Sequence, residues 1–343
     1  MPAFSLGQTL WRTFNRVIRD WFLVGMLGAV ALASLFPSLG KSGGLLHIDQ
    51  VTDVGIALVF FLHGLGLSMT SLRDGLLRWR VHVLVQLFTF AVFPLLWWLA
   101  NAALGDRVSP GLVLGFCYLC ALPSTISSSV AMTGLARGNV PAAIFNATLS
   151  TLLGVVMTPL LITLLVGNML DGGNGAGGHA HSLTDASLAI ARLLLLPLVA
   201  GMALRPALHK WHVRFKRYTN LLDRFVILLL VFGAFCNSVA SGVWRDQGLE
   251  VLGETLAGVA VLLAIVLALT TWTARRLGFA TEDEITAVFC GSKKTLASGV
   301  PMAKLLFGAH PALGLIVLPI MLYHQLQLFV CSVLASRYGA RER

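Results

Sequence analysis

The feature that most constrains this chain is a series of apolar runs, each roughly 20 residues long, that recurs along the whole sequence. A helix of about 20 apolar residues spans the ~30 Å hydrocarbon core of a bilayer. Only 12% of the residues are charged, about half the share found in soluble domains. The pattern excludes a water-soluble globule and predicts an all-α polytopic membrane protein in a lipid bilayer. The ten predicted spans are 20–39, 51–70, 81–101, 111–136, 140–167, 185–204, 221–241, 252–274, 283–306 and 311–336.

Lysine and arginine residues alternate between the connections on the two sides of these spans. With the N-terminus inside, 18 of the 25 Lys and Arg residues fall on inside segments. The outside loops hold only Lys41, Arg107 and Arg245. Because basic residues are retained on the cytoplasmic side, both termini are expected to be cytoplasmic, in the plasma membrane (bacterial inner membrane). The formal charge of +10 is explained by these loops, so nucleic acid is not expected as a partner.

A stretch in the fourth span resembles one in the ninth. Residues 120–142 and 290–312 agree at nine of 23 positions without a gap, at an offset of 170 residues. The chain is therefore expected to contain a first five-helix repeat at 1–167, a Gly-rich external linker at 168–184 and a second five-helix repeat at 185–343. An odd number of helices in each half makes the repeat inverted. Secondary transporters are often built this way, with their site near the midplane.

Both matching stretches are poor helix formers. The first contains Pro123 and a run of serine and threonine, and the second contains Gly299 and Pro301 beside two lysines. Proline removes a backbone donor and clashes with the preceding turn, and backbone groups freed at membrane depth must face protein or a water-filled cavity. Two broken, crossing helices with a substrate or ion site are favoured over ordinary packed kinks. The expected site residues are Thr125, Ser127, Ser128, Ser129, Asn146, Lys293, Lys294, Thr295 and Ser298, supported by Gln86 and His63.

Lys293 and Lys294 lie near the middle of the ninth span. Ionisable residues at this depth are costly and usually mark function. Because helical neighbours diverge by about 100°, one lysine is expected to face a cavity and the other an acceptor. An unpaired positive charge favours a small-molecule anionic substrate. Two alternatives remain open: an ammonium that takes the place of a bound metal cation, and a lysine that exchanges protons and so allows proton coupling. Na+ and H+ are the candidate coupling ions.

Other chemistry is not indicated. All five cysteines lie in apolar segments, where small buried side chains are expected rather than disulfides or zinc ligands. His179 and His181, in the Gly-rich linker, are expected to be solvated rather than to bind a metal. His63 is interpreted as a packing donor rather than a proton relay. No acid lies at depth to complete a hydrolase set with Ser128, so no enzyme activity and no cofactor are expected.

Four motifs carry a resemblance to a known family: PSTISSSVAMT at 123–133, RGN at 137–139, FNATL at 145–149 and FCGSKKTLASGVP at 289–301. With them the chain resembles the bile acid:sodium symporter superfamily, in particular the branch of the seventh member of the human solute carrier ten family and its bacterial relatives. The resemblance implies ten helices, a core domain with crossed helices four and nine, a panel domain, and symport by alternating access.

The resemblance also implies where sodium ligands would lie. The helix-four Ser–Asn pair of the bile acid branch corresponds approximately to Ser128 and Ser129. Its helix-five Ser and Thr correspond to Ala143 and Ala147, and its helix-nine Glu and Gln fall near Cys290 and Lys294. Most of the sodium ligands are therefore replaced here.

The sequence thus predicts a secondary active transporter of a small or amphipathic organic anion that lacks the sodium coupling of the bile acid branch. A ligand-binding regulatory membrane protein without transport is one alternative, and a sodium-coupled symporter with altered ion ligands is another.

Overall fold

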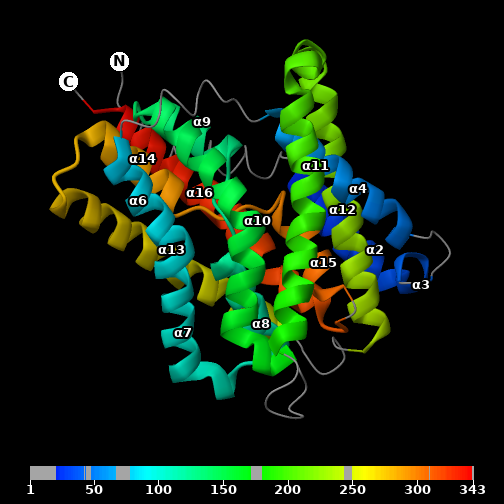
Figure 1. Cartoon of the computed structure of the whole chain (residues 1–343). Coiled ribbons are helices and arrows are strands. Elements are labelled where there is room, and N and C mark those ends of the chain that lie inside the picture. Colours follow the sequence, from blue (N-terminus) through cyan, green and yellow to red (C-terminus); the bar gives the residue numbers. More distant parts are fainter. Residues whose placement is uncertain are drawn as a thin grey trace.

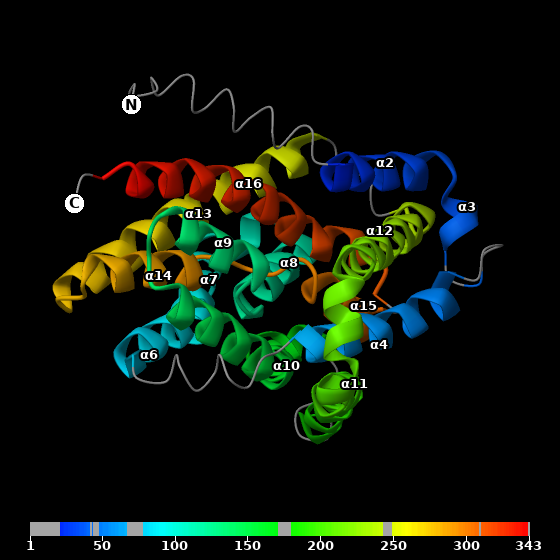
Figure 2. The ribbon, with the colours of Figure 1, turned by 90° about the horizontal axis from the view of Figure 1, so that it is seen from above.

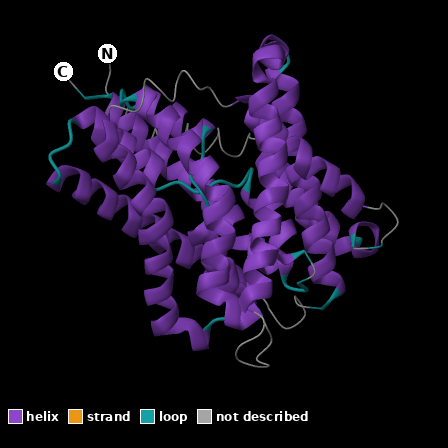
Figure 3. Cartoon of the chain, viewed as in Figure 1, coloured by secondary structure: helices purple, strands orange, loops and turns teal. Residues whose placement is uncertain are grey.

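The computed structural model describes residues 21–41, 43, 48–66, 78–170, 180–242, 249–308 and 310–341. Within these ranges the regular elements are helices (Figure 3), as the apolar runs predict. Figure 1 labels most of them. Their bounds are α2 (Trp21–Leu35), α3 (Pro37–Gly40), α4 (Ile48–Gly66), α6 (Trp79–Leu87), the π-helix η2 (Phe88–Val92), α7 (Phe93–Leu104), the 3-10 helix η3 (Gly105–Arg107), α8 (Pro110–Ala121), α9 (Ser127–Leu135), α10 (Val140–Leu170), α11 (Ala180–Arg214), α12 (Lys216–Ala240), α13 (Leu249–Arg276), α14 (Thr281–Gly291), α15 (Gly299–Phe307) and α16 (Leu313–Gly339).

The length and composition of these helices suit a polytopic membrane protein. Large apolar side chains such as Leu164, 80% exposed, and Leu196, 70% exposed, lie on the outer surface, where contact with lipid is favourable and contact with water is not. Five described stretches are long and apolar enough to cross a membrane: Trp79–Leu104, Val140–Val166, Lys216–Ala240, Glu250–Arg276 and Leu313–Gly339. Four shorter apolar helices are Val24–Leu35, Gln50–Gly66, Pro110–Ala121 and Leu194–Leu208.

Two helices are longer than the sequence predicts. The linker expected at 168–184 is shortened at both ends, because α10 continues to Leu170 and α11 begins at Ala180. Residues 171–179, His179 among them, lie outside the described residues, as does the side chain of His181. The sixth span, expected to end at 204, continues to Arg214. The residues after 204 include alanine, leucine and lysine, which favour helix even where hydropathy falls.

The helices form two groups. In the four-helix group, α4 packs along α11 and α2 packs along α12. The broken-helix group contains α6 to α10 and α13 to α16, and α8 packs closely against α16 within it. Figures 1 and 2 show the two groups side by side, with α10, α15 and α16 nearest to the boundary. Most of the buried apolar core lies in one continuous cluster that extends through both groups.

Two glycines allow α4 and α11 to touch through their backbones. A Cβ atom on Gly64 would lie 2.1 Å from the carbonyl oxygen of Leu198, and one on Gly201 would lie 2.1 Å from that of Phe61. No larger residue fits at either position without moving a helix. Small residues are typical of such close helix pairs in membranes. This backbone contact sets the distance between α4 and α11, and therefore the distance between the side chains that lie near the two glycines.

Buried acids hold one end of the broken-helix group together. Asp283 accepts a hydrogen bond from Asn139 Nδ2 at 2.8 Å and lies 3.1 Å from Arg78 Nη1. Glu284 accepts one from Arg275 Nε at 3.1 Å. Both acids lie in the first turn of α14, where negative charge also stabilises the helix dipole. The first turn of α14 is thus tied to the starts of α6 and α10 and to the end of α13.

Candidate functional site

The two helices predicted to break do so, at neighbouring places in the structure. Between α8 and α9 the chain is extended from Leu122, and α14 and α15 are separated by residues 292–298. The two breaks are hydrogen-bonded to each other, because Thr295 N–H donates to the Pro123 carbonyl at 3.0 Å. The first break is also bonded to the end of α14, where Ser124 Oγ donates to the Cys290 carbonyl at 2.6 Å. Backbone groups that the breaks release are therefore partly satisfied across the contact, as burial requires.

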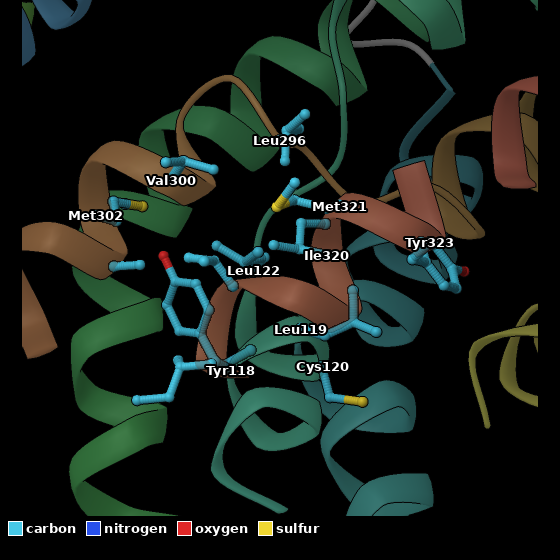
Figure 4. Close-up of a cluster of buried hydrophobic side chains, with 14 of the residues drawn as sticks. Tyr118, Leu119, Cys120, Leu122, Leu296, Val300, Met302, Ile320, Met321 and Tyr323 are labelled. Atoms are coloured by element: carbon cyan, nitrogen blue, oxygen red, sulfur yellow. The ribbon is translucent and has the colours of Figure 1, made fainter. Parts of the chain in front are cut away.

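Side chains from other helices hold the backbone of the second break. Tyr118 donates to the Gly299 carbonyl at 2.5 Å and Tyr323 to the Ser292 carbonyl at 2.7 Å. Gln327 accepts from the Lys294 N–H at 2.9 Å and donates to its carbonyl at 2.8 Å. Figure 4 shows both tyrosines in an apolar cluster that surrounds the breaks. A long, flexible break would be mobile, whereas this one is fixed at several carbonyls.

Lys294 is completely buried, and its ammonium group lies among backbone oxygens. Its Nζ donates to the carbonyls of Thr89 at 2.8 Å, Cys120 at 2.8 Å and Leu122 at 2.6 Å. The Phe93 ring centroid lies 4.1 Å away, within the range of a cation–π contact. We call the three oxygens of Thr89, Cys120 and Leu122 the carbonyl cradle. It holds a cation with partial negative charges alone, as a metal site built from backbone oxygens would.

The origin of the carbonyl cradle lies in two irregularities of the helices. Cys120 and Leu122 lie at the C-terminal end of α8, where the last carbonyls have no partner in the helix. Thr89 lies in the π-helical stretch η2 between α6 and α7, and π-bulges displace carbonyls from the regular ladder. Both therefore present oxygens that a buried ammonium can use.

Lys293 is also completely buried and also has an acceptor. Its Nζ donates to the Ser128 carbonyl at 2.8 Å and lies 5.6 Å from the Phe289 ring. The sequence led us to expect one lysine facing a cavity with an unpaired charge. The structure differs, because backbone carbonyls of other helices accept from both ammonium groups.

A cavity of about 480 Å³ lies between the two helix groups. We call it the central cavity. On the side of the broken-helix group its polar lining contains His324 of α16 and the hydroxyls of Ser124, Thr125, Ser127, Ser128, Thr148, Thr151, Thr295 and Ser298. On the side of the four-helix group its polar lining contains His63, Arg205, His212, Lys216, Asn220, Asp223 and Arg224. The cavity therefore has one neutral hydroxyl wall and one charged wall.

The predicted site residues divide between this cavity and the protein interior. Those that line the central cavity are Thr125, Ser127, Ser128, Thr295, Ser298 and His63. Ser129 is buried and donates to the Phe289 carbonyl at 3.1 Å. Gln86 Nε2 contacts Asn146 at its carbonyl, 3.3 Å, and at its Oδ1, 3.4 Å. Ser129, Asn146 and Gln86, like both lysines, lie behind the cavity wall and support it.

Apart from His63, sequence reasoning missed the charged wall. Arg205 is partly buried, its Nε makes no hydrogen bond within the described chain, and no ion pair reaches it there. Asp223 Oδ1 lies 3.5 Å from His63 Nε2, close enough for an ion pair if the imidazole is protonated. Its neighbour Pro206 lies inside α11 and does not end it, so Arg205 lies on a helix rather than in a loop.

The described residues contain no group of three or more His, Cys, Asp or Glu side chains arranged to hold a metal ion. The hydroxyl wall, the charged wall and the carbonyl cradle are therefore the chemistry that the site offers. Hydroxyls and guanidinium groups can donate hydrogen bonds to a solute.

Comparison with known proteins agrees with this geometry. Residues 20–340 match the SBF-like CPA transporter family. The chain is 42% identical over 326 residues to "Putative symporter YfeH" of Escherichia coli, and the matched region covers 94% of this chain and 93% of that relative. It is 48% identical over 327 residues to "Uncharacterized protein PA2026" of Pseudomonas aeruginosa, with 95% of each chain covered. It is 30% identical over 326 residues to "Sodium/bile acid cotransporter 7" of Rattus norvegicus, with 94% and 93% covered.

Proposed function

The chain belongs to the SBF-like CPA transporter family, and on this premise we propose that it is a secondary active transporter of a small or amphipathic organic anion that works by alternating access. Transport, rather than catalysis, is the activity of the family. The central cavity supports the substrate class, since it combines a hydroxyl wall with a wall on which cationic side chains outnumber acidic ones.

The architecture we propose is two inverted five-helix repeats, at 1–167 and 185–343, giving ten membrane spans with both termini in the cytoplasm of a bacterial cell. Two observations support it. The interrupted helices α8–α9 and α14–α15 lie at the positions that the 170-residue offset relates. Their breaks contact each other through the Thr295 and Pro123 backbones. In inverted-repeat transporters, half-helix ends at the midplane form the site.

The observation that carries the anion proposal is Arg205. A guanidinium that lines a cavity without an acidic partner is costly, and a bound carboxylate, sulfonate or phosphate would remove that cost with bidentate hydrogen bonds. Lys216 lines the same cavity. Asp223 lies 3.5 Å from His63. In the described chain it makes no ion pair with Arg205. The counter-charge for the substrate thus comes from α11 and α12 rather than from the lysines of α14–α15.

The hydroxyl wall supplies the remaining contacts of the proposed substrate. Ser128, Thr295 and Ser298 line it from the two breaks. Because these hydroxyls both donate and accept hydrogen bonds, they suit the polar groups of an organic anion. Movement of the broken-helix group relative to the four-helix group would open the cavity to one side and then to the other.

Lys294 supports transport without sodium at the carbonyl cradle. Its ammonium already makes three hydrogen bonds there, at 2.6–2.8 Å, so a metal ion would have to displace a covalently attached cation. Ala143 and Ala147 supply no side-chain oxygen at the positions that correspond to the helix-five sodium ligands of the bile acid branch. A sodium-coupled symporter with altered ligands is the second candidate, favoured by the name of the rat relative. Proton coupling through a lysine is a third.

The test is uptake into proteoliposomes of purified protein, with taurocholate as one probe and small organic anions as others. Uptake should continue when potassium or choline replaces sodium. Arg205→Gln should weaken apparent affinity roughly 10-fold or more, the equivalent of one charge-assisted hydrogen bond of about 1.5–3 kcal/mol. Lys210→Gln is the matched control, because Lys210 lies on the same helix, is exposed and does not line the cavity.

Three outcomes would contradict parts of this proposal. Strict sodium dependence of uptake would refute the proposal that transport needs no sodium at the carbonyl cradle. Equal effects of Arg205→Gln and Lys210→Gln would refute recognition by Arg205. Binding of a probe, detected as a rise in melting temperature, without flux in proteoliposomes would favour a ligand-binding regulatory protein.

A further inference from the structure

A groove of about 750 Å³ lies on the outer surface between α13 and α16, away from the central cavity. Its sides are largely apolar, with Leu267 and Ala268 on α13 and Val330 and Val333 on α16. We call it the α13–α16 groove. It is separate from the site of the proposed transport activity, because none of its lining residues lines the central cavity.

The lining positions follow one face of each helix. On α13 they recur from Leu267 to Arg276 at intervals of one and three residues, and on α16 from Phe329 to Arg337 in the same way. Residues with this spacing share a helix face. Both lining faces end in arginine near the C-terminal ends of the two helices. Figure 2 shows the two helices diverging toward these ends.

The end of the groove near the C-termini of α13 and α16 carries an excess of positive charge. Arg275, Arg276 and Arg337 line it, and the acid that pairs with any of them in the described chain is Glu284, 3.1 Å from Arg275 Nε. Arg276 lies 5.5 Å from the Trp272 ring centroid. Arg337 is exposed and makes no ion pair with a described residue. Within the described chain, one of the three guanidinium groups is thus paired with a carboxylate and the other two make no ion pair.

The dimensions of the groove suit one leaflet of a bilayer. From Leu267 to Arg276 the α13 face is about 14 Å long at 1.5 Å per residue, close to half of the ~30 Å hydrocarbon core. Trp272 lies beside the arginines and is 58% exposed, and tryptophan is enriched where the apolar core of a membrane meets the headgroups. The lined face as a whole is therefore about one leaflet long, with an apolar part that leads into a cationic part beside Trp272.

From this arrangement we propose that the α13–α16 groove binds an anionic phospholipid. The arginines contact the lipid phosphate, for which the guanidinium fork is well suited, and an acyl chain lies along the apolar face. Basic pockets between membrane helices bind anionic headgroups for the same reason. A second copy of this chain is a poorer occupant, since it would bring like charge to the same three arginines.

A lipid held here would join two helices that control the breaks. Arg275, at the end of α13, is paired with Glu284 of α14. On α16, Gln327 holds the backbone of Lys294. Bound lipid would therefore fix the outer edges of the elements that carry the second break, and it would stabilise the broken-helix group as a unit.

The experiment uses the purified full-length protein in detergent, with dioleoylphosphatidylglycerol as the anionic lipid and dioleoylphosphatidylcholine as its uncharged-headgroup counterpart. Native mass spectrometry measures retained lipid, and thermal unfolding measures stabilisation. Phosphatidylglycerol should be retained and should raise the melting temperature. The double variant Arg276→Gln/Arg337→Gln should weaken retention at least 10-fold. Arg214→Gln, an exposed arginine at the end of α11, should retain it as the unaltered protein does.

Each of four results would overturn the proposal. Equal retention of the two lipids would mean that the groove is only apolar. Unchanged retention by the double variant would place the lipid elsewhere. Equal stabilisation by inorganic phosphate would assign the arginines to a free anion. If the protein forms a dimer that dissociates in the double variant, a second copy of the chain is the occupant of the groove. None of these readouts depends on transport, so the two proposals fail separately.

Discussion

Replacing Gly64 by alanine would separate the helices that carry His63 and Arg205. The added Cβ atom would lie 2.1 Å from the Leu198 carbonyl oxygen, whereas ordinary Cβ contacts begin at 3.4 Å. The helices α4 and α11 must therefore move apart by the difference, roughly 1.3 Å. The obstacle is backbone and cannot rotate aside. Overpacking typically costs ~1–3 kcal/mol, and we expect about 3 kcal/mol because the contact is equally tight at Gly201.

The assay is thermal unfolding in detergent together with uptake into proteoliposomes. For a chain of this length, about 3 kcal/mol corresponds to a fall in melting temperature of roughly 5 °C. Uptake should also fall, because His63 and Arg205 would move apart across the charged wall. Gly28→Ala and Gly253→Ala are the controls. No heavy atom lies within 4 Å of a Cβ at either position, so these changes should be neutral or stabilising by up to about 1 kcal/mol.

The reasoning is refuted if Gly64→Ala melts together with the two controls and transports normally. That result would mean that α4 and α11 are not held at backbone contact. A lower melting temperature with normal uptake would keep the packing argument but would remove its link to the cavity.

Three further predictions concern single residues. Lys294→Met leaves three carbonyl oxygens without their donor, at a cost of about 1–3 kcal/mol each, whereas Lys293→Met leaves one carbonyl oxygen without its donor. The melting temperature should therefore fall further for Lys294→Met, and equal falls would contradict this. Asp283→Asn removes an ion pair and a negative charge at the start of α14 and should cost about 1–2 kcal/mol, measured by thermal unfolding at low and high salt, with a larger effect at low salt. Burial lowers the pKa of His310 below its usual 6.5, and its Nδ1 accepts from the Ala312 N–H at 3.1 Å. The unfolded chain therefore binds this proton more readily, so stability should fall as pH drops below about 6.5, and His310→Gln should lose that part of the pH dependence.

The breaks could be predicted because their causes are residue types. Pro123 cannot donate a backbone hydrogen bond, and Gly299 and Pro301 are poor helix formers, so each interruption is visible in the sequence. Ser128 and Thr295 were expected at the site for the same reason, and both line the central cavity. The all-helical class followed from hydropathy alone.

The partners of the lysines could not be predicted. The oxygens that accept from Lys294 are main-chain atoms, which every residue has, and one of them belongs to Thr89 in a π-helical stretch without a sequence signature. Arg205 was placed in a loop because hydropathy falls at that point, although α11 continues to Arg214. Gly64 and Gly201 are far apart in the chain, and only the fold pairs them.

The carbonyl cradle has a thermodynamic consequence that concerns the direction of transport. An ion that binds with the substrate on one side and leaves on the other transfers the energy of its gradient, whereas the ammonium of Lys294 returns with every cycle and transfers none. Where no other ion accompanies it, a singly charged anion then responds to the membrane potential alone. At 100 mV, negative inside, that potential is worth ~2.3 kcal/mol per charge, or about 50-fold in concentration at 1.4 kcal/mol per tenfold. A transporter with this permanently attached cation would move such an anion out of the cell, or exchange it for another, rather than accumulate it inside.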